Sequence, residues 1–231
     1  MVLGGLQKSS LIDYPGSVSC IVFTIGCNMA CGYCHNPELS KPVQPIKTNF
    51  TEENFFEFLE TRKGKLEAVV ITGGEPTIHD DLPEFISKIK KMGFKVKLDT
   101  QGTRPKMVEE LLNNDLVDYI AMDIKAPFER YQEVTRALIN TEDIKETINL
   151  IMTKAKGYEF RTTTVKGQLD SEDFEKIGKM IEGAPLYAIQ KFVSAGKTLD
   201  PSFEHRESYD DKKLEELKKI MEKYVKKVII R

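Results

Sequence analysis

Short apolar runs alternate along the chain with longer stretches in which apolar residues recur at helical spacing. This alternation, with no strand-only or helix-only region, favours a parallel sheet with right-handed crossovers. We therefore predict an α/β fold, an open (β/α)6 barrel that is partial because six units cannot complete an eight-strand closure. The six runs that indicate strands are 18–24, 68–72, 94–98, 117–125, 158–165 and 186–193. The predicted helices are 81–91, 103–113, 141–155 and 171–182, with two more starting at Glu52 and Asp210 and with Thr51, Asp81 and Ser171 as N-caps.

Four segments lie outside this repeat. Residues 1–17 predict a lead-in strand and a turn. Residues 37–49 contain three prolines and little apolar pattern, so they predict an ordered loop. Residues 126–140 form a mixed polar stretch, and residues 225–231 fit either a short closing strand or a helix end.

Composition narrows the class of protein. The chain has 34 basic against 36 acidic residues and a net charge of -2, which argues against a surface for nucleic acid or anionic membranes. No stretch approaches the ~18 apolar residues of a membrane span, and the N-terminus lacks a basic region followed by an apolar one. We expect a cytoplasmic protein in which residues 1–231 form one domain, with a short N-terminal lead-in and a C-terminal helix.

Three of the four cysteines fall within eight residues, at Cys27, Cys31 and Cys34. Structural zinc sites usually recruit four ligands, often as two separated Cys-x2-Cys pairs, whereas this chain has one dense group. A [4Fe-4S] cube held by three cysteines leaves one iron with an open site, where chemistry can occur. We predict one such cluster on these three residues. Cys20 lies in an apolar strand and is expected to be a core residue, and His35 is expected to pack beside the ligands rather than bind iron.

With Tyr33 before the third cysteine, this motif resembles the signature of the radical S-adenosylmethionine (SAM) superfamily. The longer stretches 12–16, 26–28 and 33–37 resemble the activating enzymes of glycyl-radical enzymes, most of all the activating proteins of anaerobic ribonucleoside-triphosphate reductase. The resemblance runs over nearly the whole chain. It implies a partial barrel of the radical SAM type, with one [4Fe-4S] cluster and SAM as cofactors and with Tyr33 beside them.

A glycine pair after the second strand resembles the GGEP motif of the superfamily, whose backbone and carboxylate hold the amino group of SAM. Here the motif is Gly73, Gly74, Glu75 and Pro76. Glycine admits a close backbone approach, and Glu75 can accept a charge-assisted bond from an amine.

Two later strand ends resemble further parts of the SAM site. Asp99 and Thr100 begin a stretch similar to the D-T-N-G motif of pyruvate formate-lyase activating enzymes, with Gln101 in place of asparagine, where the family binds SAM and a cation. A turn or capping role is the alternative for Asp99. Asp123 and Lys125 share one strand face in a segment similar to the family's M/L-D-L-K, which implies that Lys125 meets the SAM carboxylate; a surface ion pair is the alternative.

The resemblance adds two candidates and assigns no catalytic residue beyond the cluster and SAM site. Arg161 is an unusual arginine inside a β-branched strand and is a candidate SAM contact. Gln190 stands where pyruvate formate-lyase activating enzymes have a histidine that touches SAM, and it matches the ribonucleotide-reductase branch.

The implied reaction is reductive cleavage of SAM by one electron from a flavodoxin or ferredoxin. The resulting 5′-deoxyadenosyl radical would take a hydrogen from a glycine of anaerobic ribonucleoside-triphosphate reductase. Three alternatives stay open: an activase of another glycyl-radical enzyme such as pyruvate formate-lyase, a radical SAM enzyme for a small molecule, and a plain electron carrier. The second often has further C-terminal cysteines, which this chain lacks after Cys34, and the third needs no glycine turn.

Overall fold

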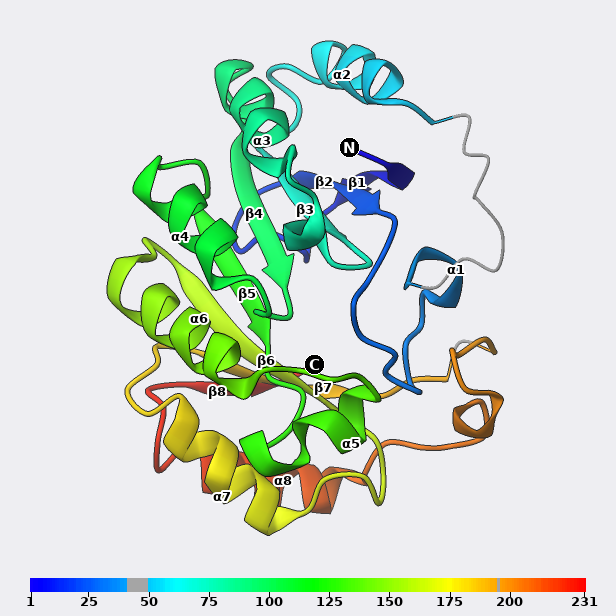
Figure 1. The fold of residues 1–231 in the computed structure, drawn as a ribbon, viewed down its shortest axis with the longest axis vertical. Helices are drawn as coiled ribbons and strands as arrows, with labels where there is room; N and C mark the ends of the chain where they lie inside the picture. The colour runs from blue at the N-terminus through cyan, green and yellow to red at the C-terminus, as the bar shows by residue number, and fades with distance from the viewer. Residues whose placement is uncertain (41–49, 195) are drawn as a thin grey trace.

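In the computed structural model, which describes residues 1–40, 50–194 and 196–231, eight strands form one open sheet (Figure 1). The strands follow the order of the sequence from β1 to β8. β1 pairs antiparallel with β2, and each later pair of neighbours is parallel. The strands are β1 (Leu3–Ser10), β2 (Ser19–Thr24), β3 (Ala68–Gly73), β4 (Lys95–Thr100), β5 (Tyr119–Asp123), β6 (Tyr158–Thr164), β7 (Tyr187–Lys191) and β8 (Val228–Ile230).

The predicted α/β fold with a partial barrel is confirmed. The six predicted strands correspond to β2 through β7, and helices follow them on the outer side of the sheet (Figure 1). The lead-in strand is β1, and the undecided C-terminal residues contribute the edge strand β8. The helices are α1 (Pro37–Ser40), α2 (Glu52–Glu60), α3 (Leu82–Lys91), α4 (Pro105–Asn113), α5 (Tyr131–Thr135), α6 (Thr141–Lys154), α7 (Ser171–Met180) and α8 (Asp211–Met221), with 3-10 turns η1 (Pro76–Ile78), η2 (Phe128–Arg130) and η3 (Pro201–Phe203).

Two segments have more structure than the sequence predicts. The start of the expected loop is the helix α1, because Pro37 occupies a first helical position that needs no N–H donor, and the N–H of Leu39 and of Ser40 donate to the carbonyl of Asn36. The rest of that expected loop, 41–49, lies outside the described residues. The polar stretch 126–140 contains η2 and α5.

The helix caps agree with the sequence in part. Thr51 caps α2 in a capping box, as expected. Asp81 makes no cap bond, because its carboxylate binds the terminal amino group of Met1 instead. The cap of α7 is Asp170 rather than Ser171; its carboxylate accepts two backbone N–H bonds of the first turn.

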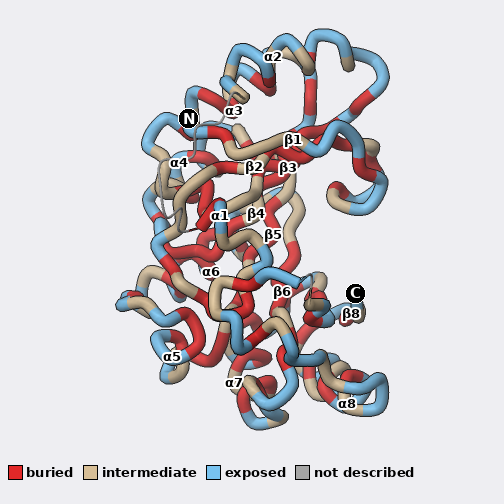
Figure 2. Tube along the Cα trace, turned by 90° about the vertical axis from the view of Figure 1, so that its right-hand side faces the viewer, coloured by how far each residue is buried: buried red, intermediate tan, exposed pale blue. Residues whose placement is uncertain are grey.

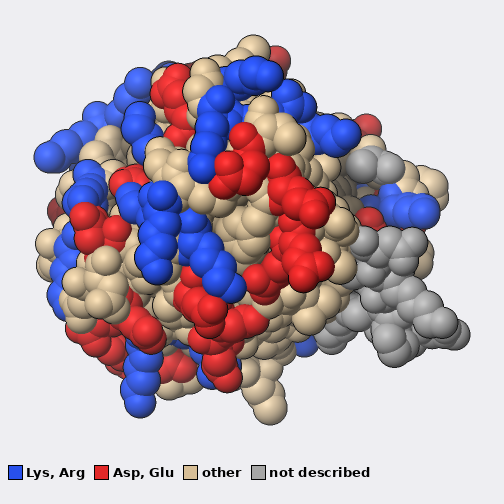
Figure 3. All heavy atoms as spheres, turned by 90° about the horizontal axis from the view of Figure 1, so that it is seen from above, with Lys and Arg blue, Asp and Glu red and all other residues tan. Residues whose placement is uncertain are grey.

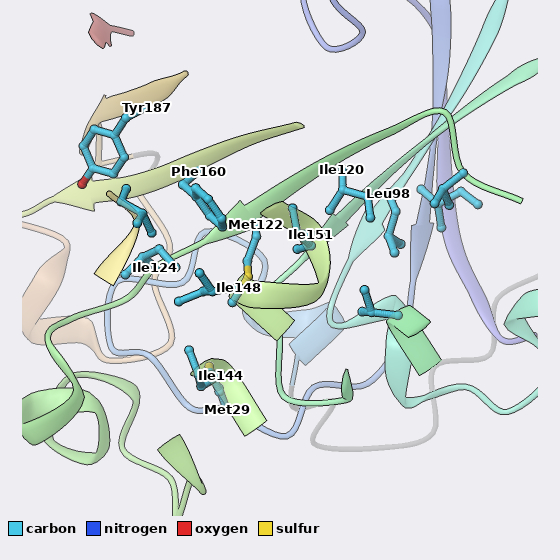
Figure 4. Close-up of a cluster of buried hydrophobic side chains, with 14 of the residues drawn as sticks. Met29, Leu98, Ile120, Met122, Ile124, Ile144, Ile148, Ile151, Phe160 and Tyr187 are labelled. Carbon is cyan, nitrogen blue, oxygen red and sulfur yellow. The ribbon is translucent and has the colours of Figure 1, made fainter. Parts of the chain in front are cut away.

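The apolar core lies between the outer face of the sheet and the helices, and the buried segments run through the middle of the molecule (Figure 2). Alternate strand residues divide between the two faces: Val69 and Ile71 are buried in the core, whereas Val70 and Thr72 line an inner cavity. Met29, on the cysteine loop, belongs to the same cluster and anchors that loop (Figure 4). The labelled members of the cluster in Figure 4 are Met29, Leu98, Ile120, Met122, Ile124, Ile144, Ile148, Ile151, Phe160 and Tyr187.

The surface carries both signs of charge. Figure 3 shows acidic and basic side chains interspersed over one face, in keeping with the net charge of -2. Within the described residues, no helix is long and apolar enough to cross a membrane.

Candidate cofactor site

A cavity of about 620 Å³ lies on the inner side of the sheet, toward the carboxyl ends of β2 to β7. Every residue nominated from the sequence for cofactor binding lines this cavity, whereas Cys20 is fully buried in the outer core. The fold therefore gathers the nominated residues from five strands, β3 to β7, and from the segments that follow β2, β3 and β5 around a single space, as expected where parallel strands end. The nominated residues are Cys27, Cys31, Tyr33, Cys34, Gly73, Gly74, Glu75, Asp99, Thr100, Asp123, Lys125, Arg161 and Gln190.

The three candidate cluster ligands lie on the loop that follows β2, and all are free thiols. The N–H of Cys34 donates to the carbonyl of Cys31 over 3.0 Å, and the N–H of Met29 donates to the Cys27 sulfur over 3.4 Å. Among the described residues, no group of His, Cys, Asp or Glu is arranged to hold a single metal ion. A cube is a different case, because each thiolate binds a different iron. Three thiols that line one cavity fit a [4Fe-4S] cluster.

Burial disfavours the thiolate forms that would bind iron. It raises the pKa of the Cys27 thiol to about 12, and it also raises the pKa of Cys31. The ammonium of Lys125 acts in the opposite direction and lowers the pKa of both thiols. Iron must therefore displace the protons of these thiols when it binds, and the positive charge of Lys125 favours their loss.

Two distant segments hold the backbone of the cysteine loop. The N–H of Ala30 donates to the carbonyl of Thr135, at the end of α5, over 2.8 Å. On the other side, the N–H of Asp200 donates to the carbonyl of Gly32 over 3.0 Å. The N–H of Leu199 donates to the carbonyl of Cys34 over 3.2 Å. These bonds fix the loop from both sides.

The two segments are also joined to each other. The Arg136 guanidinium lies 2.6 Å from the Asp200 carboxylate and 5.6 Å from the centre of the Phe203 ring. Gly32 is needed beneath this ring, because a Cβ there would lie 2.6 Å from a Phe203 carbon. We call Thr135, Arg136, Leu199, Asp200 and Phe203 the loop clamp. Beside it, the His35 ring stacks on Phe192 with centroids 5.0 Å apart, in agreement with its expected packing role.

Glu75 forms one wall of the cavity and is only 1% exposed. Its Oε1 accepts bonds from the N–H of Thr77 at 3.1 Å and the hydroxyls of Thr77 at 2.5 Å and Thr100 at 2.7 Å. Its Oε2 accepts one bond, from the N–H of Gln101 at 2.8 Å. Burial raises the pKa of Glu75, and these four bonds oppose that rise. Because a carboxylate oxygen can accept two bonds, Oε2 keeps capacity for one further donor.

The glycine pair before Glu75 serves the chain itself. Gly73 has φ +120°, and a Cβ on it would lie 2.4 Å from the backbone nitrogen of Thr24. A Cβ on Gly74 would lie 1.9 Å from the carbonyl oxygen of Gly26. The N–H of Glu75 donates to that same carbonyl over 2.7 Å. The close approach expected at these glycines therefore occurs between the end of β3 and the start of the cysteine loop.

A second wall, on β4, β5 and β6, is a chain of alternating charges. Lys97 Nζ lies 2.9 Å from Asp99 Oδ1, and Asp99 Oδ2 lies 3.1 Å from Arg161 Nη1. Arg161 Nε donates to Asp123 Oδ1 over 2.8 Å, and Lys125 Nζ donates to Asp123 Oδ2 over 3.0 Å. We call these five residues the charged wall. The ion pair considered as the alternative for Lys125 does form, with Asp123, but it is largely buried rather than on the surface, because the Lys125 side chain is only 15% exposed.

The charged wall favours the charged forms of Asp123 and Lys125. Burial opposes the charge of Asp123, but Arg161 and Lys125 outweigh it and bring the pKa of this carboxyl to about 2. Burial also opposes the charge of Lys125, and Asp123, Tyr33 and Cys31 reverse this and raise its pKa. The ammonium of Lys125 lies 6.0 Å from the centre of the Tyr33 ring, which joins the charged wall to the cysteine loop.

Two residues of the site were not found from the sequence. Lys97 alternates with apolar neighbours, which is typical of a solvent-facing strand residue, yet it is only 3% exposed because that face of β4 turns inward. Its position two residues before Asp99 was the available signal. Asn28 donates from its amide to the Thr103 hydroxyl over 2.9 Å and accepts from the Gln101 amide, so it links the cysteine loop to the end of β4.

Known proteins are similar to this chain over most of its length. The family model of the radical SAM superfamily matches residues 21–181. A protein of Methanocaldococcus jannaschii named as a glycyl-radical enzyme activating enzyme, MJ1227, is 38% identical over 235 residues, which covers 100% of this chain and 95% of the relative. The pyruvate formate-lyase-activating enzyme of Listeria monocytogenes is 32% identical over 131 residues, 52% of this chain and 51% of that protein.

A solved structure agrees with the fold. The crystal structure of Streptococcus suis SuiB bound to S-adenosylmethionine superposes with a TM-score of 0.66 and 13% identity. The match covers 91% of this chain and 51% of SuiB, so the chain spans about half of that protein. At this level of identity the likeness concerns the fold alone.

Proposed function

The chain belongs to the radical SAM superfamily, and we propose that it is an activating enzyme that makes a glycyl radical on anaerobic ribonucleoside-triphosphate reductase. Similarity to MJ1227 over 100% of the chain supports the activase class. The choice of reductase is supported by the sequence likeness of residues 12–16, 33–37 and Gln190 to that branch. An activase for another glycyl-radical enzyme is compatible with the similarity to a pyruvate formate-lyase-activating enzyme.

The superfamily uses a [4Fe-4S] cluster and SAM, which together supply a 5′-deoxyadenosyl radical and release methionine when one electron arrives, here from a flavodoxin or ferredoxin. In this proposal Cys27, Cys31 and Cys34 hold three irons. Glu75 Oε2 takes the SAM amine as its second donor, and Lys125 faces the SAM carboxylate.

The remaining nominated residues orient the cofactor. Gly73 and Gly74 shape the turn that presents Glu75, while Thr100 and Asp99 fix the two walls at the end of β4. Asp123 and Arg161 hold Lys125 in place. Tyr33 and Gln190 close the cavity from the cysteine loop and from β7.

Exposed apolar residues at the rim of the cavity support a macromolecular substrate. Ile12 lines the cavity yet is 86% exposed, and its neighbour Leu11 is 78% exposed. Val193, beside the His35 stack, is 68% exposed. Apolar side chains at a cavity entrance suit a protein surface that covers the opening. A glycine loop can enter because it has no Cβ, and its Cα loses one hydrogen atom to form 5′-deoxyadenosine and the glycyl radical.

Electron paramagnetic resonance of the reduced, SAM-supplied mixture with the reductase tests this proposal. A doublet should appear on the reductase, with one SAM consumed per radical. The doublet should collapse to a singlet when glycine deuterated at Cα is incorporated, and it should be absent when the radical glycine is replaced by alanine. SAM cleavage without a radical on the reductase would favour another glycyl-radical enzyme or a small-molecule substrate.

A matched pair of variants tests the rim. Ile12→Asp should lower the yield of reductase radical by about tenfold, because a charge would be buried under the partner, while cleavage of SAM without the partner stays unchanged. Leu138→Asp is the control, since Leu138 is 93% exposed and does not line the cavity. Equal radical yields from the two variants would contradict docking at this rim.

A further inference from the structure

Lys97 is a buried cation with no role in the site as assigned so far. Its side chain is only 4% exposed, and it lies beneath the cavity rather than on its lining. A lysine is seldom buried to this degree unless it is paired, and its pair is Asp99 at 2.9 Å. Among the described residues, its charged partner is therefore Asp99, which lines the cavity.

The charged wall has an unequal number of charges. Lys97, Arg161 and Lys125 are positive, whereas Asp99 and Asp123 are negative, so the wall carries one excess positive charge. Glu159, a buried carboxylate two residues before Arg161 on β6, is paired with Arg231 through two bonds of 2.7 and 2.9 Å and is therefore not counted in the wall. The excess positive charge exists because Lys97, which lies outside the cavity lining, offsets the charge of Asp99.

We propose that Lys97 is a positioning residue that sets the preference of the cavity for a ligand carboxylate. Asp99 lies between Lys97 and Arg161, and Asp123 lies between Arg161 and Lys125. The three cations thus share two carboxylates, so that one positive charge remains for the ligand. Without Lys97 the wall would be neutral, and the Arg161 guanidinium, which already contacts Asp99, would have to balance that carboxylate without the help of Lys97. This inference rests on the proposed placement of the SAM carboxylate at Lys125.

The test measures what we call the carboxylate preference, the dissociation constant of decarboxylated SAM divided by that of SAM. Both are titrated calorimetrically into anaerobic, cluster-loaded, oxidised protein, in which SAM is bound but not cleaved. The ratio cancels any change that affects the amine, sulfonium and adenosyl parts equally. Lys97→Met keeps the volume and removes the charge, and it should lower the carboxylate preference by about tenfold.

Lys97→Met leaves Asp99 with one partner fewer and can lower stability, so each variant is also melted by circular dichroism. The double variant Lys97→Met/Asp99→Asn removes both charges and restores one excess positive charge to the wall. Its carboxylate preference should return to within about twofold of the wild-type value. A preference that stays low in the double variant would show that charge is not the cause and would overturn the inference.

The variant Lys125→Met shows whether a negative result concerns the role of Lys97 or the proposed SAM orientation. If Lys125→Met lowers the carboxylate preference and Lys97→Met leaves it unchanged, the role of Lys97 is wrong and the proposed SAM orientation stands. If neither substitution changes the preference, the carboxylate does not bind at this wall, and both proposals fail.

Discussion

The two walls of the cavity stabilise their carboxylates in different ways. Glu75 accepts four bonds from neutral hydroxyl and amide donors, and no cation of the described residues pairs with it. Asp99 and Asp123, on the second wall, are each held between two cations. The first wall therefore presents a negative charge that can meet a cationic group, and the second presents an excess positive charge that can meet an anionic one. The amino-acid end of SAM is a zwitterion and complements this arrangement.

The largest expected effect concerns the three thiols that line the same cavity as the two walls. Replacing Cys27, Cys31 or Cys34 with alanine should abolish the near-visible iron–sulfur absorbance after anaerobic reconstitution, because three thiolates are needed for the cube. Cys20→Ala is the matched control and should keep the absorbance, since Cys20 lies in the outer core. A folded Cys20→Ala protein without the cluster would make the ligand assignment wrong.

The next largest effect is expected when the charge of Glu75 is removed. Glu75→Gln should weaken SAM binding by about one to two decades, because a charge-assisted bond contributes roughly 1.5 to 3 kcal/mol. Thr77→Val removes a hydroxyl donor and leaves the charge, so it should weaken binding much less. Titration calorimetry of the cluster-loaded proteins compares them. Equal losses would mean that Glu75 acts as a structural link between β3 and β4 rather than as the amine acceptor.

The charged wall should be visible in acid stability. The pKa of Asp123 is about 2 in the folded protein against an ordinary value of 3.8, so its contribution is fully present above pH 3.8 and is lost as pH falls toward 2. This shift corresponds to about 2 kcal/mol of unfolding free energy. Urea unfolding at a series of pH values should show this loss in the wild type. Asp123→Asn should start lower and vary less over that interval; an equal slope would contradict the assigned pKa.

The smallest effect concerns the loop clamp. Arg136→Ala removes the contacts to Asp200 and Phe203 but keeps the three backbone bonds to the cysteine loop. Because the Arg136 side chain is 47% exposed, this ion pair is worth less than about 1 kcal/mol, and iron loss to a chelator should accelerate about two- to fivefold. Lys156→Ala, which breaks an exposed pair with Asp115, should leave the rate unchanged. Equal rates in both variants would assign the clamp no role in cluster retention.

Periodicity predicted strands β2 to β7, because each of them carries a clear apolar outer face. Motif spacing predicted the nominated residues that line the cavity. The short helix α1 was not predicted, and the strand β8 was left open against a helix end, since four and three residues are too few for a periodic signal. Lys97 was missed for another reason. Alternation along β4 cannot distinguish a face turned to solvent from a face turned into the barrel.

The loop clamp could not be predicted at all. Its residues lie in two segments about 65 positions apart in sequence, and each contacts the cysteine loop through backbone atoms. Arg136 adopts a left-handed conformation, with φ 53°, which an arginine in the sequence does not predict. Contacts of this kind follow from the way the whole chain folds and not from local sequence.

An anaerobic crystal structure of the cluster-loaded protein with SAM tests the central claim most directly. The account predicts the SAM ammonium nitrogen within about 3.2 Å of Glu75 Oε2 and the SAM carboxylate within about 3.2 Å of Lys125 Nζ. It also predicts that Lys97 keeps its contact with Asp99 in the complex. A SAM molecule with its carboxylate on the Glu75 side, or with its amino-acid end outside the cavity, would contradict the account.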